Sequence, residues 1–327
     1  MEGFILPNVQ YADNAKISQK NWVIGKQVKT PTSSPWPVPV APLALAAASV
    51  AQRWVRRKVK HRAVLQRCAL PASVPPAPPS DVIILPDADA VGKRLCKEVA
   101  EAAKAAIAER GSFAIAIPGG SILKMLAAGT SELEGVEWDK GVLAYVNHKC
   151  VSNDDAAATH KKATELFLSG WSGLQVITVG GSADGEAEAK LYEDSLRALP
   201  SSVLPRASEL PVFDICLIGV GDDGHFGSLY PGRKEIADET AAWVLAVDMK
   251  SPPSITLAPK VMMASKKVLV ASAGVSEKYP MGKSEAMKTA IEGSEGPQAF
   301  PAQVLRSSAQ WLLDEAAASK LSPEYKN

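Results

Sequence analysis

The sequence predicts an α/β domain with a mainly parallel sheet and helices on both faces, similar to a Rossmann fold, behind a basic N-terminal extension. Short apolar segments alternate with amphipathic helical segments from residue 81 onward. Charge separates the two parts, because residues 1–70 hold 11 of the 36 Lys/Arg residues but only 2 of the 35 Asp/Glu residues. We therefore divide the chain into an extension, residues 1–80, and a folded domain, residues 81–327.

Strands are predicted where apolar residues run together, and helices where they recur every three or four positions. The predicted strands are Val82–Leu85, Phe113–Ile117, Val142–Val146, Leu174–Val179, Phe213–Val220, Trp243–Val247 and Val268–Ala273. The predicted helices are Asp89–Arg110, Ile122–Ala128, Glu186–Leu199, Ala258–Lys266, Lys283–Ile291 and Gln303–Ser319. Ligands bind outside the carboxyl ends of such strands. The site is therefore expected at the loops after Ile117, Val146, Val220 and Ala273.

The extension is rich in Pro, Ser, Thr and Ala and poor in acids. Residues 30–42 hold five prolines and residues 71–80 hold five more, a composition that buries too little apolar surface to offset the entropy of ordering. It is typical of an organelle transit peptide, which predicts a plastid location, with a cytoplasmic protein as the alternative. A flexible tail is a second interpretation. A third is a basic amphipathic segment, from about Leu45 to Leu65, that contacts an anionic membrane surface.

Composition also argues against several classes of protein. No run reaches the ~18 apolar residues of a membrane span. The basic run has few aromatic residues and the folded domain is acidic, so we expect no nucleic-acid partner. Neither a zinc site nor a disulfide framework is predicted, because the cysteines are widely spaced and form no Cys-x-x-Cys pair: Cys68, Cys96, Cys150 and Cys216.

The segment Pro118-Gly119-Gly120-Ser121 follows a predicted strand and opens a predicted helix. Two glycines let the backbone approach an anion closely, and a helix N-terminus offers free N–H groups with a partial positive charge. Ser121 can cap the helix and also bind a phosphate oxygen. The segment is therefore either a phosphate-binding loop or an ordinary turn between a strand and a helix.

A second glycine-rich segment, Gly219–Gly232, follows the predicted strand Phe213–Val220. It contains His225, one of only four histidines, and Asp223 stands two residues earlier. An imidazole that titrates near neutral pH suits proton transfer from water, and Asp223 can orient or polarise it. The alternative is a loop histidine with a structural hydrogen bond. The position at a strand end and the density of glycines favour the catalytic interpretation.

These segments resemble a known family. Residues Gly221–Gly232 are similar to the G-x-D-G-H-x-A-S-L-F-P-G signature of 6-phosphogluconolactonases, and Pro118–Ser121 to their S-G-G-S phosphate loop. Weaker similarities lie in Ser254–Leu257 (family R-I-T-L), Lys283–Met287 (family K-A-E-A-V), Pro301–Gln303 and Trp311–Ala317. The resemblance extends from about Asp81 to Ser319.

The resemblance implies hydrolysis of 6-phospho-D-glucono-1,5-lactone to 6-phosphogluconate, the second step of the oxidative pentose phosphate pathway, without a metal or an organic cofactor. It implies that His225 takes a proton from the attacking water and that Asp223 supports it. The residues implied in phosphate binding are Gly119, Gly120, Ser121 and Lys283, with Lys278 as a competing lysine. The expected partner is a small sugar phosphate, and the expected assembly is a monomer or a homodimer.

The chain departs from the family after the third predicted strand. Where the family has D-E-R-C-V-P, this sequence has Asn147-His148-Lys149-Cys150-Val151-Ser152. Lys149 keeps a positive charge for the substrate but lacks the planar fork with which arginine binds an oxyanion. His148 is either a site residue, which we favour, or an exposed loop side chain, and we expect His160 at the surface. Asp154 or Asp155 is expected to cap the following helix.

Two other functions are considered. A degenerate, non-catalytic family member that binds sugar phosphates or serves as an assembly subunit would fit the loss of D-E-R, but the intact His225 loop argues against it. An amino-sugar-phosphate isomerase needs a carboxylate base. Its loop resembles D-G-H-I-A-F-N-E-P, whereas this chain has Ser228-Leu229-Tyr230-Pro231 and no Glu there, which argues against isomerisation.

Overall fold

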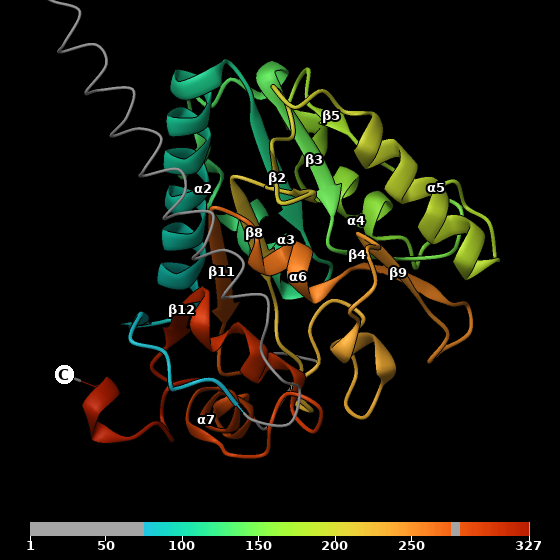
Figure 1. The fold of residues 1–327 in the computed structure, drawn as a ribbon. Helices are drawn as coiled ribbons and strands as arrows, with labels where there is room; N and C mark the ends of the chain where they lie inside the picture. The colour runs from blue at the N-terminus through green and yellow to red at the C-terminus, as the bar shows by residue number, and fades with distance from the viewer. Residues whose placement is uncertain (1–74, 276–281, 327) are drawn as a thin grey trace, which may run out of the picture. The chain divides into compact units, whose positions relative to one another are not determined.

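The computed structural model describes residues 75–275 and 282–326, and a seven-stranded sheet lies at the centre of this part (Figure 1). All of its paired strands are parallel, in the order β1-β12-β11-β8-β2-β3-β5. The strands are β1 (Val82–Leu85), β2 (Phe113–Ile117), β3 (Gly141–Tyr145), β5 (Gln175–Val176), β8 (Ile215–Ile218), β11 (Lys267–Ser272) and β12 (Ala309–Asp314). The predicted parallel α/β fold is confirmed, whereas the boundary at residue 80 stays a prediction because residues 1–74 lie outside the described part.

Helices connect the strands of this sheet. The α-helices are α2 (Ala88–Arg110), α3 (Ser121–Ala128), α4 (Thr159–Leu166), α5 (Gly185–Ala198), α6 (Pro259–Met263) and α7 (Ser284–Glu292). Short 3-10 segments are η1 (Thr130–Leu133), η2 (Trp138–Lys140), η3 (Leu168–Gly170), η4 (Lys234–Ala237), η5 (Pro301–Ser307) and η6 (Pro323–Tyr325). None of the helices in the described residues has the length and apolar character needed to cross a membrane.

Helix α2 shows why local sequence signals were sufficient in the first part of the domain. Asp87 caps its N-terminus, because the Oδ1 atom accepts the N–H of Ala90 at 2.8 Å. Gly111 ends the helix in the left-handed conformation, with φ of 78°, where glycine has no steric cost. The apolar face, which includes Val91, Leu95 and Val99, is fully buried, and the helix runs beside the sheet (Figure 1).

The chain reverses its direction of travel across the sheet between β2 and β8. From β2 it proceeds outward to β3 and β5, and from β8 it proceeds the other way to β11 and β12. The two strands are adjacent and pair through Ile115 with Ile215 and Ala116 with Cys216. In open α/β sheets, the crevice at the carboxyl ends of two such strands is where ligands bind. The two glycine-rich segments leave the sheet at this point.

The prediction of a C-terminal helix over Gln303–Ser319 is wrong. Residues Pro301–Ser307 form the 3-10 segment η5, and Ala309–Asp314 form strand β12. β12 pairs with both β1 and β11, and Trp311 is fully buried. A strand covered on both faces is apolar at consecutive positions, and such a short run cannot be distinguished from a buried helix by periodicity alone.

A second, three-stranded antiparallel sheet lies outside the main sheet. It consists of β4 (Asn147–Lys149), β10 (Ser254–Leu257) and β9 (Val244–Val247), in that order. The sequence predicted a strand at β9 but neither β4 nor β10. A further hairpin pairs β6 (Arg206–Ala207) with β7 (Leu210–Pro211). The predicted strand Leu174–Val179 is reduced to β5, and the predicted helix Ala258–Lys266 to α6.

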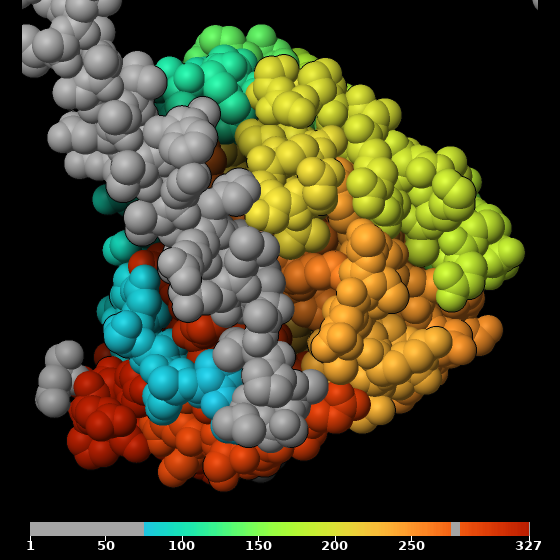
Figure 2. All heavy atoms as spheres, viewed as in Figure 1, coloured from blue at the N-terminus to red at the C-terminus, as the bar shows by residue number. Residues whose placement is uncertain are grey.

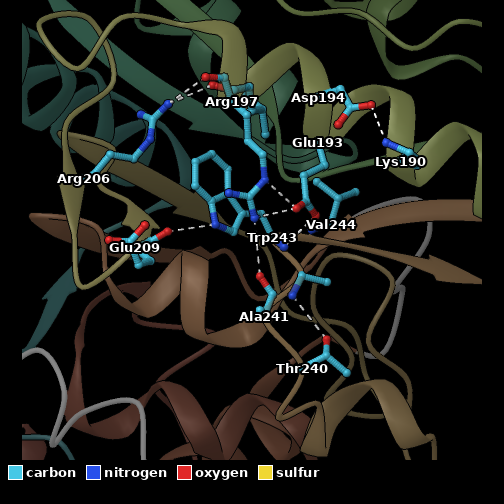
Figure 3. Close-up of polar contacts among 12 residues, drawn as sticks. Lys190, Glu193, Asp194, Arg197, Arg206, Glu209, Thr240, Ala241, Trp243 and Val244 are labelled. Atoms are coloured by element: carbon cyan, nitrogen blue, oxygen red, sulfur yellow. Dashed lines mark hydrogen bonds and ion pairs between the residues drawn. The ribbon is translucent and has the colours of Figure 1, made fainter.

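Trp243 fastens this small sheet to helix α5 (Figure 3). The guanidinium of Arg197 lies 3.9 Å from the centre of the Trp243 ring and that of Arg206 lies 4.8 Å from it. Glu193 of α5 accepts the backbone N–H of Trp243 at 2.7 Å, and the indole N–H donates to the Glu209 carbonyl at 3.0 Å. In the space-filling view, α5 in yellow-green packs directly against the orange segment that contains β9 (Figure 2).

We predict that Trp243→Ala lowers the free energy of unfolding by about 3–5 kcal/mol, the range for deleting a buried aromatic side chain. Trp243→Phe should cost less, because the ring survives as a platform for the two guanidinium groups. Urea denaturation measures both values. Equal losses in the two variants would show that the indole N–H, rather than the stacking, holds α5 to β9.

Candidate active site

The two glycine-rich segments predicted to form the site lie next to each other. Gly119 and Gly120 follow β2, and the loop containing His225 follows β8, the neighbouring strand. A Cβ atom added to Gly219 would lie 3.6 Å from Ile122 in the first turn of α3. The switch point of the sheet therefore brings a glycine turn at a helix N-terminus beside the histidine loop.

His225 and Asp223 form a hydrogen-bonded pair within one tight turn. The ring Nδ1 of His225 lies 2.5 Å from Asp223 Oδ1, and the same oxygen accepts the backbone N–H of His225 at 3.0 Å. A carboxylate can only accept, so Nδ1 carries the proton and Nε2 carries the lone pair. The imidazole side chain is 21% exposed, which leaves it accessible to a ligand.

Asp223 is ionised when His225 is neutral. Partial burial alone would raise the pKa of its carboxyl, but the hydrogen bonds from the backbone N–H and the ring of His225 outweigh burial and hold the pKa below its usual value. A carboxylate at this position favours the Nδ1–H tautomer and stabilises an imidazolium that forms when Nε2 takes a proton.

Two glycines are required for the shape of this turn. A side chain at Gly221 would overlap the Nδ1 and Cε1 atoms of His225, so the imidazole packs directly on the backbone there. Gly224 has φ of 79°, and a Cβ atom on it would lie 2.5 Å from the ring of Phe300. The turn is closed by the Gly221 N–H, which donates to the His225 carbonyl at 2.8 Å.

Tyr230 supports the other side of the imidazole. Its ring stacks on His225, with ring centres 5.0 Å apart and planes inclined by 29°. Tyr230 belongs to the same glycine-rich segment and is half-buried. The histidine is therefore held by a carboxylate at one edge, by backbone at Gly221, and by an aromatic face.

The turn after β2 has the backbone form expected of an anion-binding loop. Gly120 adopts φ of 78° and is the N-cap of α3, and Ser121 is the first helical residue. The Ser121 side chain therefore does not cap the helix, in contrast to the role suggested by the sequence. The α-carbon of Gly119 faces α4, because a Cβ atom there would lie 3.1 Å from the hydroxyl of Thr159. Backbone N–H groups at the start of α3 remain available for a ligand.

Lys283, which lies about sixty residues after the histidine loop in the sequence, contacts this loop in the structure. It precedes α7, is only 6% exposed, and donates from Nζ to the carbonyl of Val220 at 2.8 Å. Val220 directly precedes Gly221, so this ammonium lies at the carboxyl end of β8. The competing residue, Lys278, lies outside the described residues.

Comparisons with known proteins show the family to which the chain belongs. A model of the family described as glucosamine-6-phosphate isomerases/6-phosphogluconolactonase matches residues 86–313. The chain belongs to this family.

A 6-phosphogluconolactonase of Mycobacterium bovis is 32% identical over 257 residues, which cover 74% of this chain and 98% of that protein. A chain named 6-phosphogluconolactonase 3, chloroplastic, of Arabidopsis thaliana is 30% identical over 223 residues, which cover 65% of this chain and 66% of that one. The solved structure of a 6-phosphogluconolactonase from Leishmania guyanensis, at 23% identity, has a TM-score of 0.60 and covers 75% of this chain and 99% of its own. It shows that the fold is shared.

The small sheet carries the two positions where the chain lacks an arginine of the family motifs. Lys149 of β4 and Ser254 of β10 are directly paired across the two strands. Lys149 is exposed and lies on the same face of β4 as Asn147, whose side-chain amide donates to Ser228 of the histidine loop at 3.1 Å. The two family arginines that this chain lacks therefore correspond to two directly paired residues of one sheet beside the site.

His148 does not face the site, contrary to our prediction. It is fully buried, its Nδ1 lies 2.7 Å from the Lys149 carbonyl, and its Nε2 accepts the backbone N–H of His160 at 3.2 Å. Both nitrogens are used structurally. His160 is at a helix start as predicted but is half-buried, with Nδ1 2.8 Å from the Tyr145 hydroxyl. Asp155 accepts the N–H of Ala157 before α4, whose N-cap is Ala158.

Within the described residues, no group of three or more His, Cys, Asp or Glu side chains is arranged to hold a metal ion. Three of the cysteines are buried with free thiols: Cys96, Cys150 and Cys216. The groups that the fold brings to the candidate site are an imidazole, a carboxylate, lysines and backbone N–H groups.

We predict that His148 makes folding stability depend on pH. Burial lowers the pKa of its imidazole in the folded state, whereas the unfolded value is about 6.5. The unfolded state then binds more protons as pH falls below about 6.5, so stability falls by up to about 1.4 kcal/mol per pH unit until the folded pKa is reached. His148→Gln should reduce this slope in urea denaturation between pH 7 and pH 5, and an unchanged slope would contradict the assignment.

Proposed function

We propose that the chain is a 6-phosphogluconolactonase in which His225 is the general base. The observation that carries the proposal is the Asp223–His225 pair, which leaves Nε2 as the ring nitrogen that can accept a proton, in the loop after β8, the strand next to β2. The curated relatives that carry the name of this enzyme include the Mycobacterium bovis protein, which is 32% identical and is covered over 98% of its length. The substrate would be 6-phospho-D-glucono-1,5-lactone and the product 6-phosphogluconate.

The chemistry requires one proton to be moved twice. Nε2 of His225 takes a proton from water as the oxygen bonds to the lactone carbonyl carbon. The tetrahedral intermediate then collapses, the bond from this carbon to the ring oxygen breaks, and the imidazolium returns the proton to the ring oxygen. Asp223 stabilises the transient positive charge and keeps the ring in the reactive tautomer. The sum is lactone plus water to the open-chain acid.

The phosphate end would be held by the turn after β2. Gly119, Gly120 and Ser121 present backbone N–H groups and a hydroxyl where β2 meets α3, and an anion is stabilised there by the helix dipole. Lys283 adds a buried ammonium at the end of β8, and Lys149 adds an exposed one from the small sheet. We expect the enzyme to act as a monomer or a homodimer, without a cofactor.

The proposal predicts that the purified protein hydrolyses the lactone faster than buffer and that His225→Ala abolishes the acceleration. Lys149→Ala should raise KM more than it lowers kcat, because it removes a charge that binds substrate and transition state alike. Asp223→Asn should lower kcat by an order of magnitude or more, because it no longer fixes the tautomer. If wild type and His225→Ala both match buffer, the chain is a binding subunit rather than an enzyme.

We infer that residues 1–80 are a plastid leader ahead of the catalytic domain, residues 81–327. The support is the acid-poor, Pro- and Ser-rich composition and the chloroplastic relatives in Arabidopsis thaliana and rice. A reporter fused to residues 1–80 should be imported by plastids and shortened. A reporter that stays cytoplasmic at full length would favour the cytoplasmic alternative.

A further inference from the structure

Lys250 lies close to the imidazole, in a loop to which the sequence motifs assigned no function. The loop 248–253 joins β9 to β10. The Lys250 ammonium lies 4.7 Å from the centre of the Tyr230 ring, and the His225 ring lies 5.0 Å from the same centre. The ammonium and the imidazole centre are therefore no more than 9.7 Å apart, which is within the reach of a sugar phosphate.

No carboxylate in residues 75–275 or 282–326 neutralises the charge of Lys250. Among the described residues no carboxylate forms an ion pair with Lys250, whereas its neighbour Asp248 is engaged by Arg233. Lys250 is exposed, and the contact with the Tyr230 ring is a cation–π interaction, which orients an ammonium without neutralising it. The side chain is thus held at the site with its charge available to an anion.

The small sheet places a second lysine, Lys149, beside the loop that carries Lys250. Lys149 is opposite Ser254, the first residue of β10, immediately after the loop that carries Lys250. The loop is fixed to β4 because the Cys150 N–H donates to the Pro253 carbonyl at 2.8 Å. Two lysines, one from β4 and one from the β9–β10 loop, thus lie where the family motifs have arginine and this chain does not.

We propose that Lys250 is a substrate-binding residue that takes an oxyanion group of the sugar phosphate, with Tyr230 as the platform that positions both Lys250 and His225. This inference rests on the proposed function for the identity of the ligand. The group bound is either the phosphate or the carboxylate that forms when the lactone opens. Both are oxyanions that an ammonium recognises through charge-assisted hydrogen bonds.

Binding of 6-phosphogluconate tests the proposal whether or not the enzyme turns over. Lys250→Met keeps most of the side-chain length and removes the charge, so calorimetry should show about tenfold weaker binding, the usual scale for one charged hydrogen bond. Lys104→Met, an exposed lysine on α2, is the matched control and should bind as wild type. Unchanged affinity in Lys250→Met would overturn the proposal, even if lactone hydrolysis by wild type is fast.

Glucose 6-phosphate identifies the group, because it has the phosphate but no carboxylate. Weaker binding of both ligands to Lys250→Met assigns the phosphate, and weaker binding of 6-phosphogluconate alone assigns the carboxylate. In the active enzyme, Lys250→Met should raise KM with kcat little changed.

The aromatic ring of Tyr230, rather than its hydroxyl, should position His225 and Lys250. Tyr230→Phe should therefore behave as wild type, whereas Tyr230→Leu should both raise KM and lower kcat. A kcat unaffected by Tyr230→Leu would show that Tyr230 does not position His225.

Discussion

The hydrogen bond between Asp223 and His225 is the interaction on which the site depends. It joins two side chains only two residues apart, so it exists only because the intervening chain folds back on itself. Gly221 and Gly224 permit that turn, one by leaving space for the imidazole and the other by its positive φ. The bond fixes which ring nitrogen is free. The direction in which the histidine can accept a proton is therefore set by backbone geometry.

The parallel sheet gives this pair its location. β8 is buried along its whole length and emerges next to β2, where the chain changes its direction of travel across the sheet. The histidine loop and the glycine turn after β2, about a hundred residues apart in sequence, thereby become neighbours, and we propose them as the acid–base group and the anion site. The small antiparallel sheet, held to α5 by Trp243 and two arginines, carries Lys149, and the loop between two of its strands carries Lys250. Hydrolysis of a phosphorylated lactone needs both functions in one crevice.

Local signals predicted the first part of the domain well. β1 and β2 were predicted residue for residue, and α2 to within one residue, because its apolar residues recur at helical spacing and Gly111 ends it. The β12 strand was predicted as a helix, since a strand buried on both faces lacks the alternation that identifies it. His225 and Asp223 stand out in a local motif. Lys250 could not be found this way, because its proximity to Tyr230 depends on how the β9–β10 loop folds.

The protonation state of the His225 ring tests the account most directly. Nitrogen-15 NMR of the full chain with labelled histidine distinguishes the two ring nitrogens at a pH where the imidazole is neutral. The Asp223–His225 hydrogen bond predicts that the proton is on Nδ1, facing Asp223, and that Nε2 is unprotonated. A neutral ring that carries its proton on Nε2 would contradict the account, because that nitrogen could not then accept a proton from water.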